Sequence, residues 1–225
     1  MTSALRHPRL FLWITDPHLD HLTTGQRMDW FKRIREHPST TLLLTGDVDE
    51  ATGTEQWIKN LNECGKKTYF VLGNHDYYGD DISTVRERMY RCKHDAPSVF
   101  YCPAHTSIEL DDSLYLVGVD GWSDGRAGDF LGSEITLNDY QQIRQLTNLA
   151  RKELHERLIE LGKEEGLQLR KGLTSAINEG AREILVLTHV PPFAESCWYF
   201  GNNAINEWTP HFTCISTGEV LREFG

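Results

Sequence analysis

Side chains that can bind metal ions recur in short motifs along this chain. Asp16 and His18 form an Asp-x-His motif, Asp47 follows a glycine, Asn74 lies in a Gly-Asn-His-Asp sequence, and His189 comes much later. Carboxylate, amide and imidazole donors are of intermediate hardness, which favours manganese, iron or zinc over calcium. These residue types therefore indicate a mixed metal centre, provided that the fold brings them together.

Each of these motifs follows a short apolar segment that is typical of a buried β-strand. The segments are residues 10–15, 41–45, 68–72 and 184–188. We expect them to lie side by side in one central sheet. Because ligands bind at the carboxyl ends of strands in α/β sheets, the polar side chains that follow the strands should meet in one crevice.

The remaining pattern alternates between helices and strands. Helical spacing is found at residues 26–36, 54–62 and 81–91, and further strands are expected at 98–102, 107–110 and 114–119, the last two as a hairpin. A long amphipathic helix is expected over residues 138–161, and it should end near Gly162 and Gly166. We expect its apolar stripe to pack on the core, and the alternative is that the helix binds a partner protein. The pattern predicts an α/β fold, a layered sandwich of mixed β-sheets flanked by helices.

Composition limits the class of protein. The 225 residues contain no apolar run long enough for a membrane helix and no leader-like segment, which predicts a cytoplasmic protein without a membrane partner. The five cysteines are scattered and form no CxxC pair, so we expect reduced, structural thiols. A net charge of -10 makes a nucleic-acid partner unfavourable, although it allows a phosphate-binding metal centre. No repeat or linker divides the chain, and one domain, residues 1–225, is expected.

Each motif alone is weak, because Asp-x-His and Gly-Asp also occur in turns and helix caps. Taken together and in this order, however, four motifs resemble those of the calcineurin-like metallophosphoesterase family. They are Asp16-Pro17-His18, Gly46-Asp47, Gly73-Asn74-His75-Asp76 and Thr188-His189. The resemblance implies a hydrolase of small phosphomonoesters or phosphodiesters that binds two divalent or transition metal ions, manganese or iron foremost, with zinc possible. It also implies that Asp16, His18 and Asp47 hold the first ion, and that Asp47, Asn74 and His189 hold the second.

Two ions close together could clamp the phosphate and generate hydroxide at neutral pH, which would be the nucleophile. His75 is the candidate for protonating the leaving oxygen, because imidazole titrates near physiological pH, and the resemblance gives it the same role. Asp76 could orient His75, and Arg126 could contact substrate phosphate from a glycine-rich loop. A buried structural histidine and an ordinary exposed loop are the respective alternatives. Nearby aromatic residues could shape the pocket or simply pack: Tyr77, Tyr78, Trp198, Tyr199 and Phe200.

One feature departs from the family pattern. The family completes its metal site with a Gly-His-x-His motif. In this sequence the last histidine after His189 is His211, which belongs to no such motif. The chain stops within a helix that is expected from about Gly218. We favour the explanation that the sequence is a fragment that lacks its C-terminal strand or strands with the last metal-binding histidines. Alternatively, His211 could substitute for one of those histidines. A third alternative is that the protein is a noncatalytic metal-binding or scaffold relative. A nuclease shares the chemistry but lacks support from basic residues.

Overall fold

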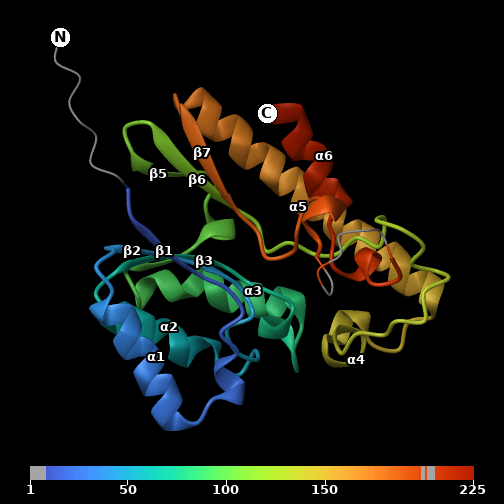
Figure 1. Ribbon diagram of the computed structural model, residues 1–225, viewed down its shortest axis with the longest axis horizontal. Helices are drawn as coiled ribbons and strands as arrows, with labels where there is room; N and C mark the ends of the chain where they lie inside the picture. Colours follow the sequence, from blue (N-terminus) through green and yellow to red (C-terminus); the bar gives the residue numbers. More distant parts are fainter. Residues whose placement is uncertain (1–8, 199–200, 202–205) are drawn as a thin grey trace.

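Two β-sheets lie face to face at the centre of the structure, and helices cover their outer faces (Figure 1). The computed structural model describes residues 9–198, 201 and 206–225, and these sheets and helices belong to that part of the chain. The order of layers is helix, sheet, sheet, helix, which confirms the predicted α/β sandwich.

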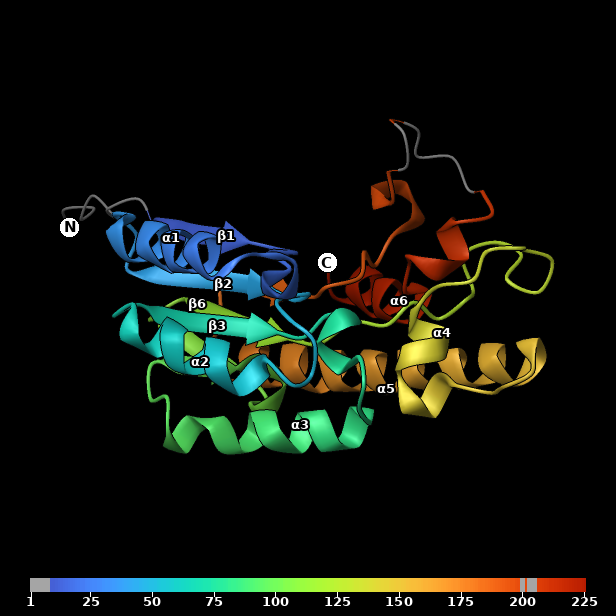
Figure 2. The same ribbon diagram turned by 90° about the horizontal axis from the view of Figure 1, so that it is seen from below.

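The first sheet is parallel and contains, in spatial order, β1 (Phe11–Ile14), β2 (Thr41–Thr45), β3 (Lys67–Val71) and β4 (Val99–Tyr101). Its outer face is covered by α1 (Thr24–Glu36), α2 (Thr54–Glu63) and α3 (Ile82–Arg91) (Figure 2). Along β2, Leu42 and Leu44 pack in the core beneath these helices, whereas Leu43 packs in the core between the sheets. Burial on both faces explains why β2 is a continuous apolar run.

The second sheet contains β5 (Ile108–Asp111), β6 (Leu114–Gly118) and β7 (Glu183–Leu187). The predicted hairpin is confirmed, because β5 and β6 pair antiparallel. The expectation that all four motif-bearing strands share one sheet is wrong, because β7 pairs with β6 in parallel and not with β1, β2 or β3. His189 therefore approaches the metal-binding motifs from the opposite layer of the sandwich.

The longest helix, α5 (Arg151–Asn178), covers the second sheet together with α6 (Ile215–Phe224). The prediction that glycines end this helix is wrong, because Gly162 and Gly166 lie inside it. A Cβ at Gly162 would lie 2.5 Å from the Cβ of Asp124, and one at Gly166 would lie 3.1 Å from the carbonyl oxygen of Ser216. The two glycines instead allow neighbouring segments to pack closely against α5.

The segment before α5 is also not the helix that its periodicity predicts. It forms the short helix α4 (Asp139–Gln142), a 3-10 turn at Arg144–Leu146, and a break at Asn148, whose φ of 59° is incompatible with a continuous helix. In Figure 1 this segment lies beyond the edges of both sheets. Its apolar residues Tyr140, Ile143 and Leu146 nevertheless join the core beneath the first sheet, which accounts for the helical spacing.

Two further results concern the predicted cellular setting. Within the described ranges, no helix is both long and apolar enough to cross a membrane. All five cysteines are free thiols.

Candidate metal centre

The loops that follow β1 and β2 hold three predicted ligands in an unusual backbone conformation. Asp16, His18 and Asp47 have φ values of 51°, 41° and 52°, a region that side-chain-bearing residues rarely occupy. The loops support each other, because the N–H of Asp16 donates to the carbonyl of Gly46 and that of His18 to the carbonyl of Asp47, both at 3.1 Å. Such strain persists only where the surrounding structure enforces it, and it is concentrated here on candidate ligands.

The glycines of two motifs are required by close packing. Gly46 has a φ of 86°, and a Cβ there would lie 2.3 Å from the backbone nitrogen of Gly73. A Cβ at Gly73 would lie 2.1 Å from Oδ1 of Asp47 and 2.8 Å from Cε1 of His189. The loops after β2 and β3 can therefore approach each other only because neither glycine has a side chain.

Asp76 fastens these two loops together. Its fully buried carboxylate accepts hydrogen bonds from the N–H groups of Gly73 (2.8 Å), Asp47 (2.9 Å), Val48 (2.9 Å) and Asp49 (3.2 Å). Burial, followed by the charge of Asp47, raises the pKa of Asp76 to about 7 against these donors. The suggestion that Asp76 orients His75 is corrected by this geometry, because both carboxylate oxygens are bound to backbone N–H groups.

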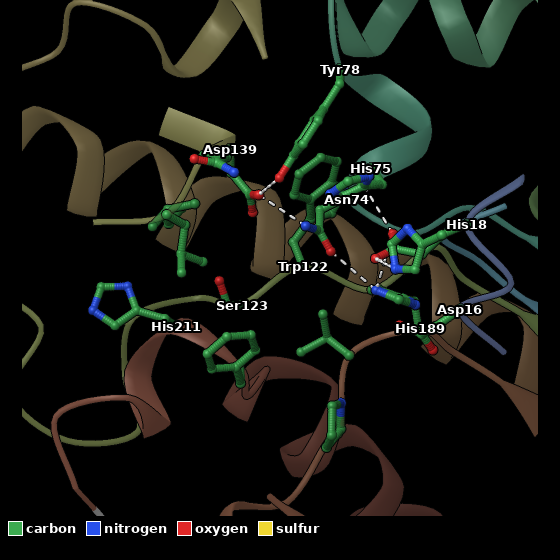
Figure 3. Close-up of a pocket in the computed structure, with 18 residues that line it drawn as sticks. Asp16, His18, Asn74, His75, Tyr78, Trp122, Ser123, Asp139, His189 and His211 are labelled. Atoms are coloured by element: carbon green, nitrogen blue, oxygen red, sulfur yellow. Dashed lines mark hydrogen bonds and ion pairs between the residues drawn. The ribbon is translucent and has the colours of Figure 1, made fainter. Parts of the chain in front are cut away.

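The predicted ligands converge from both sheets. Asp16, Asp47 and His189 each offer a donor atom within 4.8 Å of the others. Oδ1 of Asn74 lies 3.1 Å from Nε2 of His189, and Nε2 of His18 lies 3.8 Å from Oδ2 of Asp47. Figure 3 shows Asp16, His18, Asn74 and His189 gathered at one end of a cavity that Asp47 also lines. The fold thus brings together all five predicted ligands.

His189 is oriented as a metal ligand would be. Its Nδ1 lies 2.7 Å from the carbonyl oxygen of Thr45, so Nδ1–H is the donor and the lone pair of the neutral ring is on Nε2. That lone pair faces Oδ1 of Asn74 at 3.1 Å and Oδ1 of Asp47 at 3.4 Å. Three acceptors facing one another are unfavourable unless a cation or a proton lies between them.

The charges around His189 favour such a cation. Burial lowers the pKa of His189, but the carboxylate of Asp47, the carbonyl of Thr45 and the carboxylate of Asp16 outweigh burial and raise the pKa overall. The same negative groups would stabilise a bound divalent ion. The residues present therefore fit a metal centre.

Asp120, which no motif identified, connects the loops from the two sheets. Its carbonyl accepts the N–H of His189 at 3.1 Å, and its Oδ1 accepts the N–H of Leu72 at 2.9 Å. Its other carboxylate oxygen accepts hydrogen bonds from Tyr77 (2.7 Å) and Arg86 (3.0 Å). Asp120 therefore fixes the relative position of the loops that carry Asn74 and His189.

His75 lines the cavity beside the ligands without belonging to the first cluster. Its ring packs against Tyr78, with 4.1 Å between ring centroids, and edge-on against His18 at 4.6 Å. His18, Asp20 and His75 form a second group whose donor atoms lie within 4.8 Å of one another. Nδ1 of His75 and Oδ1 of Asp20 are buried and have no hydrogen-bond partner among the described residues. The carboxylate of Asp20 thus lies near the His75 ring, and its other oxygen, Oδ2, pairs with Nδ1 of His21 at 2.9 Å.

The cavity has a volume of about 470 Å³ and extends away from the metal ligands. Figure 3 shows Ser123, Asp139 and His211 at the end of the cavity away from Asp16 and His18. The described lining outside the ligand cluster also includes Trp122, Leu137, Asn138, Leu158 and Phe212. No lysine or arginine is found among the described residues that line it. Apart from the carboxylate of Asp139, these described side chains are aromatic, aliphatic or weakly polar, and none of them is a positive group that could pair with a second phosphate.

A buried carboxylate at this end contacts a candidate metal ligand. Oδ1 of Asp139 accepts a hydrogen bond from Nδ2 of Asn74 at 2.9 Å and another from the hydroxyl of Tyr78 at 2.6 Å (Figure 3). Burial raises the pKa of Asp139, and these two donors oppose that rise. Sequence reasoning missed Asp139 because it lies in no motif and falls in the segment predicted to be a long helix.

His211 does not join the ligands. Its Nδ1 lies 2.7 Å from the Tyr140 hydroxyl and its Nε2 lies 3.2 Å from the Ser133 hydroxyl, at the far end of the cavity (Figure 3). Burial, together with the charge of Arg151, lowers the pKa of His211 to about 4. His211 is thus a buried neutral histidine that is bonded through both ring nitrogens, and it does not join the candidate metal ligands.

Arg126 is also engaged elsewhere. Its guanidinium forms a bidentate pair with Glu219 at 2.6 and 3.0 Å and also donates to Ser216, and it is not among the residues that line the cavity. This placement gives no support to a contact between Arg126 and substrate phosphate. The glycine-rich loop instead anchors α6.

The aromatic candidates differ in position. Tyr78 lines the cavity, whereas Tyr77 is buried and donates to Asp120. Trp198 is 66% exposed. Tyr199 and Phe200 lie outside the described residues.

Comparisons with known proteins agree with this fold. The sequence profile of the calcineurin-like phosphoesterases matches residues 10–215. Similar solved structures include phosphopantetheinyl hydrolase from Mycobacterium tuberculosis, with a TM-score of 0.64, 13% identity, and coverage of 96% of this chain and 79% of that one. A dimetal phosphatase from Danio rerio has a TM-score of 0.50 and 15% identity, with coverage of 95% of this chain and 77% of that one. No curated protein matches the chain at a significant level.

Proposed function

The chain belongs to the calcineurin-like phosphoesterase family, and from this premise we propose that it is a dinuclear metal-dependent hydrolase of phosphate esters. The observation that carries the proposal is the convergence of Asp16, Asp47 and His189, whose donor atoms lie within 4.8 Å of one another. Strained backbone at two of these residues and a fixed tautomer at the third are consistent with a prepared cation site.

We assign the ligands as two overlapping sets. Asp16, His18 and Asp47 would hold one ion, and Asp47, Asn74 and His189 the other, with manganese or iron favoured and zinc possible. Bound divalent ions would neutralise phosphate charge and lower the pKa of a water molecule so that hydroxide forms near neutral pH. Asp76 and Asp120 would hold the ligand-bearing loops in place.

His75 is the proposed proton donor to the leaving oxygen. Its ring is held between Tyr78 and His18 and lines the cavity next to the ligand cluster. Nδ1 of His75 is buried without a hydrogen-bond partner among the described residues, and a ring nitrogen of His75 lies within 4.8 Å of a carboxylate oxygen of Asp20. A hydrogen bond from Nδ1 to this carboxylate would favour the tautomer with the proton on Nδ1 and would stabilise the imidazolium that donates from Nε2.

The lining of the cavity favours a substrate with a single phosphate group. Without lysine or arginine among its described lining residues, the far end cannot pair with a second anionic group. Trp122, Leu158 and Phe212 would instead contact an uncharged, partly apolar leaving group. A phosphomonoester or phosphodiester of an uncharged alcohol fits this arrangement, and a nuclease is disfavoured by the same lack of cations.

The noncatalytic alternative makes a different prediction from the hydrolase. A scaffold relative with an incomplete site would bind metal without turnover. The test is hydrolysis of p-nitrophenyl phosphate and bis(p-nitrophenyl) phosphate by metal-depleted protein supplied with Mn²⁺, Fe²⁺ or Zn²⁺, combined with metal analysis. Metal-dependent turnover that Asp47→Ala abolishes together with metal binding is expected. Absence of turnover with every metal despite stoichiometric binding would support the scaffold.

A further inference from the structure

The side-chain amide of Asn74 has to be held in one of two orientations to bind a cation. Only its oxygen can coordinate a metal ion, whereas the NH₂ group, which occupies nearly the same space after a 180° rotation, would repel the ion. In the structure Oδ1 lies 3.1 Å from Nε2 of His189, within the ligand cluster. Some neighbour must determine that orientation.

Asp139 is that neighbour. Its Oδ1 lies 2.9 Å from Nδ2 of Asn74, and an ionised carboxylate can only accept hydrogen bonds, so it selects the NH₂ group. Asp139 is itself fixed, because it is only 8% exposed and also accepts a 2.6 Å hydrogen bond from Tyr78. The contact joins residues 65 positions apart, from different segments of the chain.

We propose that Asp139 is a positioning residue for the metal centre, which keeps the oxygen of Asn74 directed at the ion. The inference rests on the proposed function only in that Asn74 is taken to be a metal ligand. Because Asp139 lies at the start of α4 and also lines the cavity, the segment that borders the substrate site would also control the affinity for one of the two ions. Such supporting contacts typically change metal affinity by about 10- to 100-fold.

The inference is tested by Mn²⁺ binding to the metal-depleted full chain, measured by titration calorimetry. Asp139→Leu should weaken one of the two binding events by about tenfold or more, because the amide of Asn74 loses its acceptor. Tyr78→Phe, which removes only the supporting hydroxyl, should weaken the same binding event by less.

Asn138→Ala is the matched control, because Asn138 lines the same cavity but is exposed and makes no side-chain cap. Its isotherm should equal that of the wild type.

Exchanging the two residues distinguishes a positioning role of Asp139 from a general effect of its substitution on folding. Asn74→Asp alone places two carboxylates against each other and should lose the binding event. Asp139→Asn alone keeps an acceptor oxygen and should retain most of the affinity. The double variant Asn74→Asp/Asp139→Asn restores a donor facing an acceptor with the roles reversed, so it should bind Mn²⁺ more tightly than Asn74→Asp.

Several results would overturn the inference. These are an unchanged isotherm for a folded Asp139→Leu, or a double variant no better than Asn74→Asp. If circular dichroism shows that Asp139→Leu is unfolded, the inference is tested by comparing the Mn²⁺ affinities of Asn74→Asp and the double variant alone. Wild-type protein that binds Mn²⁺ but hydrolyses no ester would refute the hydrolase and leave the positioning role intact. Wild-type protein that binds none of Mn²⁺, Fe²⁺ and Zn²⁺ would refute both.

Discussion

The carboxylate of Asp76 accepts the backbone N–H of Asp47 at 2.9 Å, so Asp76 holds the loop of the ligand that both proposed metal ions would share. The remaining bonds of Asp76 extend to Val48, Asp49 and Gly73. An acidic side chain that looks catalytic in the sequence is therefore a structural anchor. This relationship has measurable consequences for both folding and metal binding.

Asp76→Asn should destabilise the protein by about 3 kcal/mol or more, because an NH₂ group would face buried N–H donors and leave them without acceptors. Metal-free protein should show the loss in urea unfolding, and Mn²⁺ affinity should fall as well. The exposed Asp112→Asn serves as control and should change neither quantity. Wild-type stability in Asp76→Asn would contradict the anchoring role.

His75→Gln should lower kcat by about 10²- to 10⁴-fold for esters with poor leaving groups and leave metal content unchanged, since a general acid is needed most where the leaving oxygen is basic. For p-nitrophenyl phosphate, whose leaving group needs little protonation, the loss should be smaller. Asp20→Asn should reproduce this leaving-group dependence to a lesser degree. Loss of metal from His75→Gln would assign His75 to the ligands instead.

Gly73→Ala should lower metal affinity by about tenfold or more, because its Cβ would lie 2.1 Å from Oδ1 of Asp47 and displace that ligand. Gly25→Ala is the matched control, because no atom lies within 4 Å of the Cβ position at Gly25. Isothermal titration with Mn²⁺ measures both variants. Equal affinities would mean that the loops after β2 and β3 can separate without cost to the site.

Phenyl phosphate should be hydrolysed with a kcat/KM at least about tenfold above that of inorganic pyrophosphate, because no lysine or arginine is among the described residues that line the cavity. Phe212→Ala should reduce kcat/KM for phenyl phosphate by about tenfold through lost apolar contact. Phe212→Lys should shift the ratio toward pyrophosphate. A wild-type preference for pyrophosphate would refute the proposed leaving group.

Acidification should destabilise the protein through His211, whose pKa falls from its usual 6.5 to about 4 on folding. A histidine with a lowered folded pKa stabilises the native state fully above pH 6.5, and the contribution is lost as the pH falls from 6.5 to 4. The change is on the order of 3 kcal/mol. His211→Gln should flatten this part of the stability curve measured by urea unfolding, whereas His94→Gln at the exposed surface should leave it unchanged. A curve for His211→Gln as steep as that of the wild type would rule out this source.

The sequence alone determined the sandwich class, the positions of most strands and helices, and the set of candidate ligands. Strand-end motifs can be read locally, because a buried strand is a continuous apolar run and the residue after it lies at the carboxyl edge of the sheet. Asp16, Asp47 and Asn74 were found in this way. His189 was also found, although its strand was assigned to the wrong sheet.

Only the tertiary structure decided how these residues are supported. The bonds from Asn74 to Asp139, from Leu72 to Asp120 and from Asp47 to Asp76 connect distant parts of the chain, and a single acidic residue has no local pattern that predicts its partner. Periodicity likewise could not locate α5, because apolar spacing records which residues are buried and not whether the backbone between them is continuous. Asn148 interrupts the predicted helix, whereas Gly162 and Gly166, which looked like its end, are points of close packing within it.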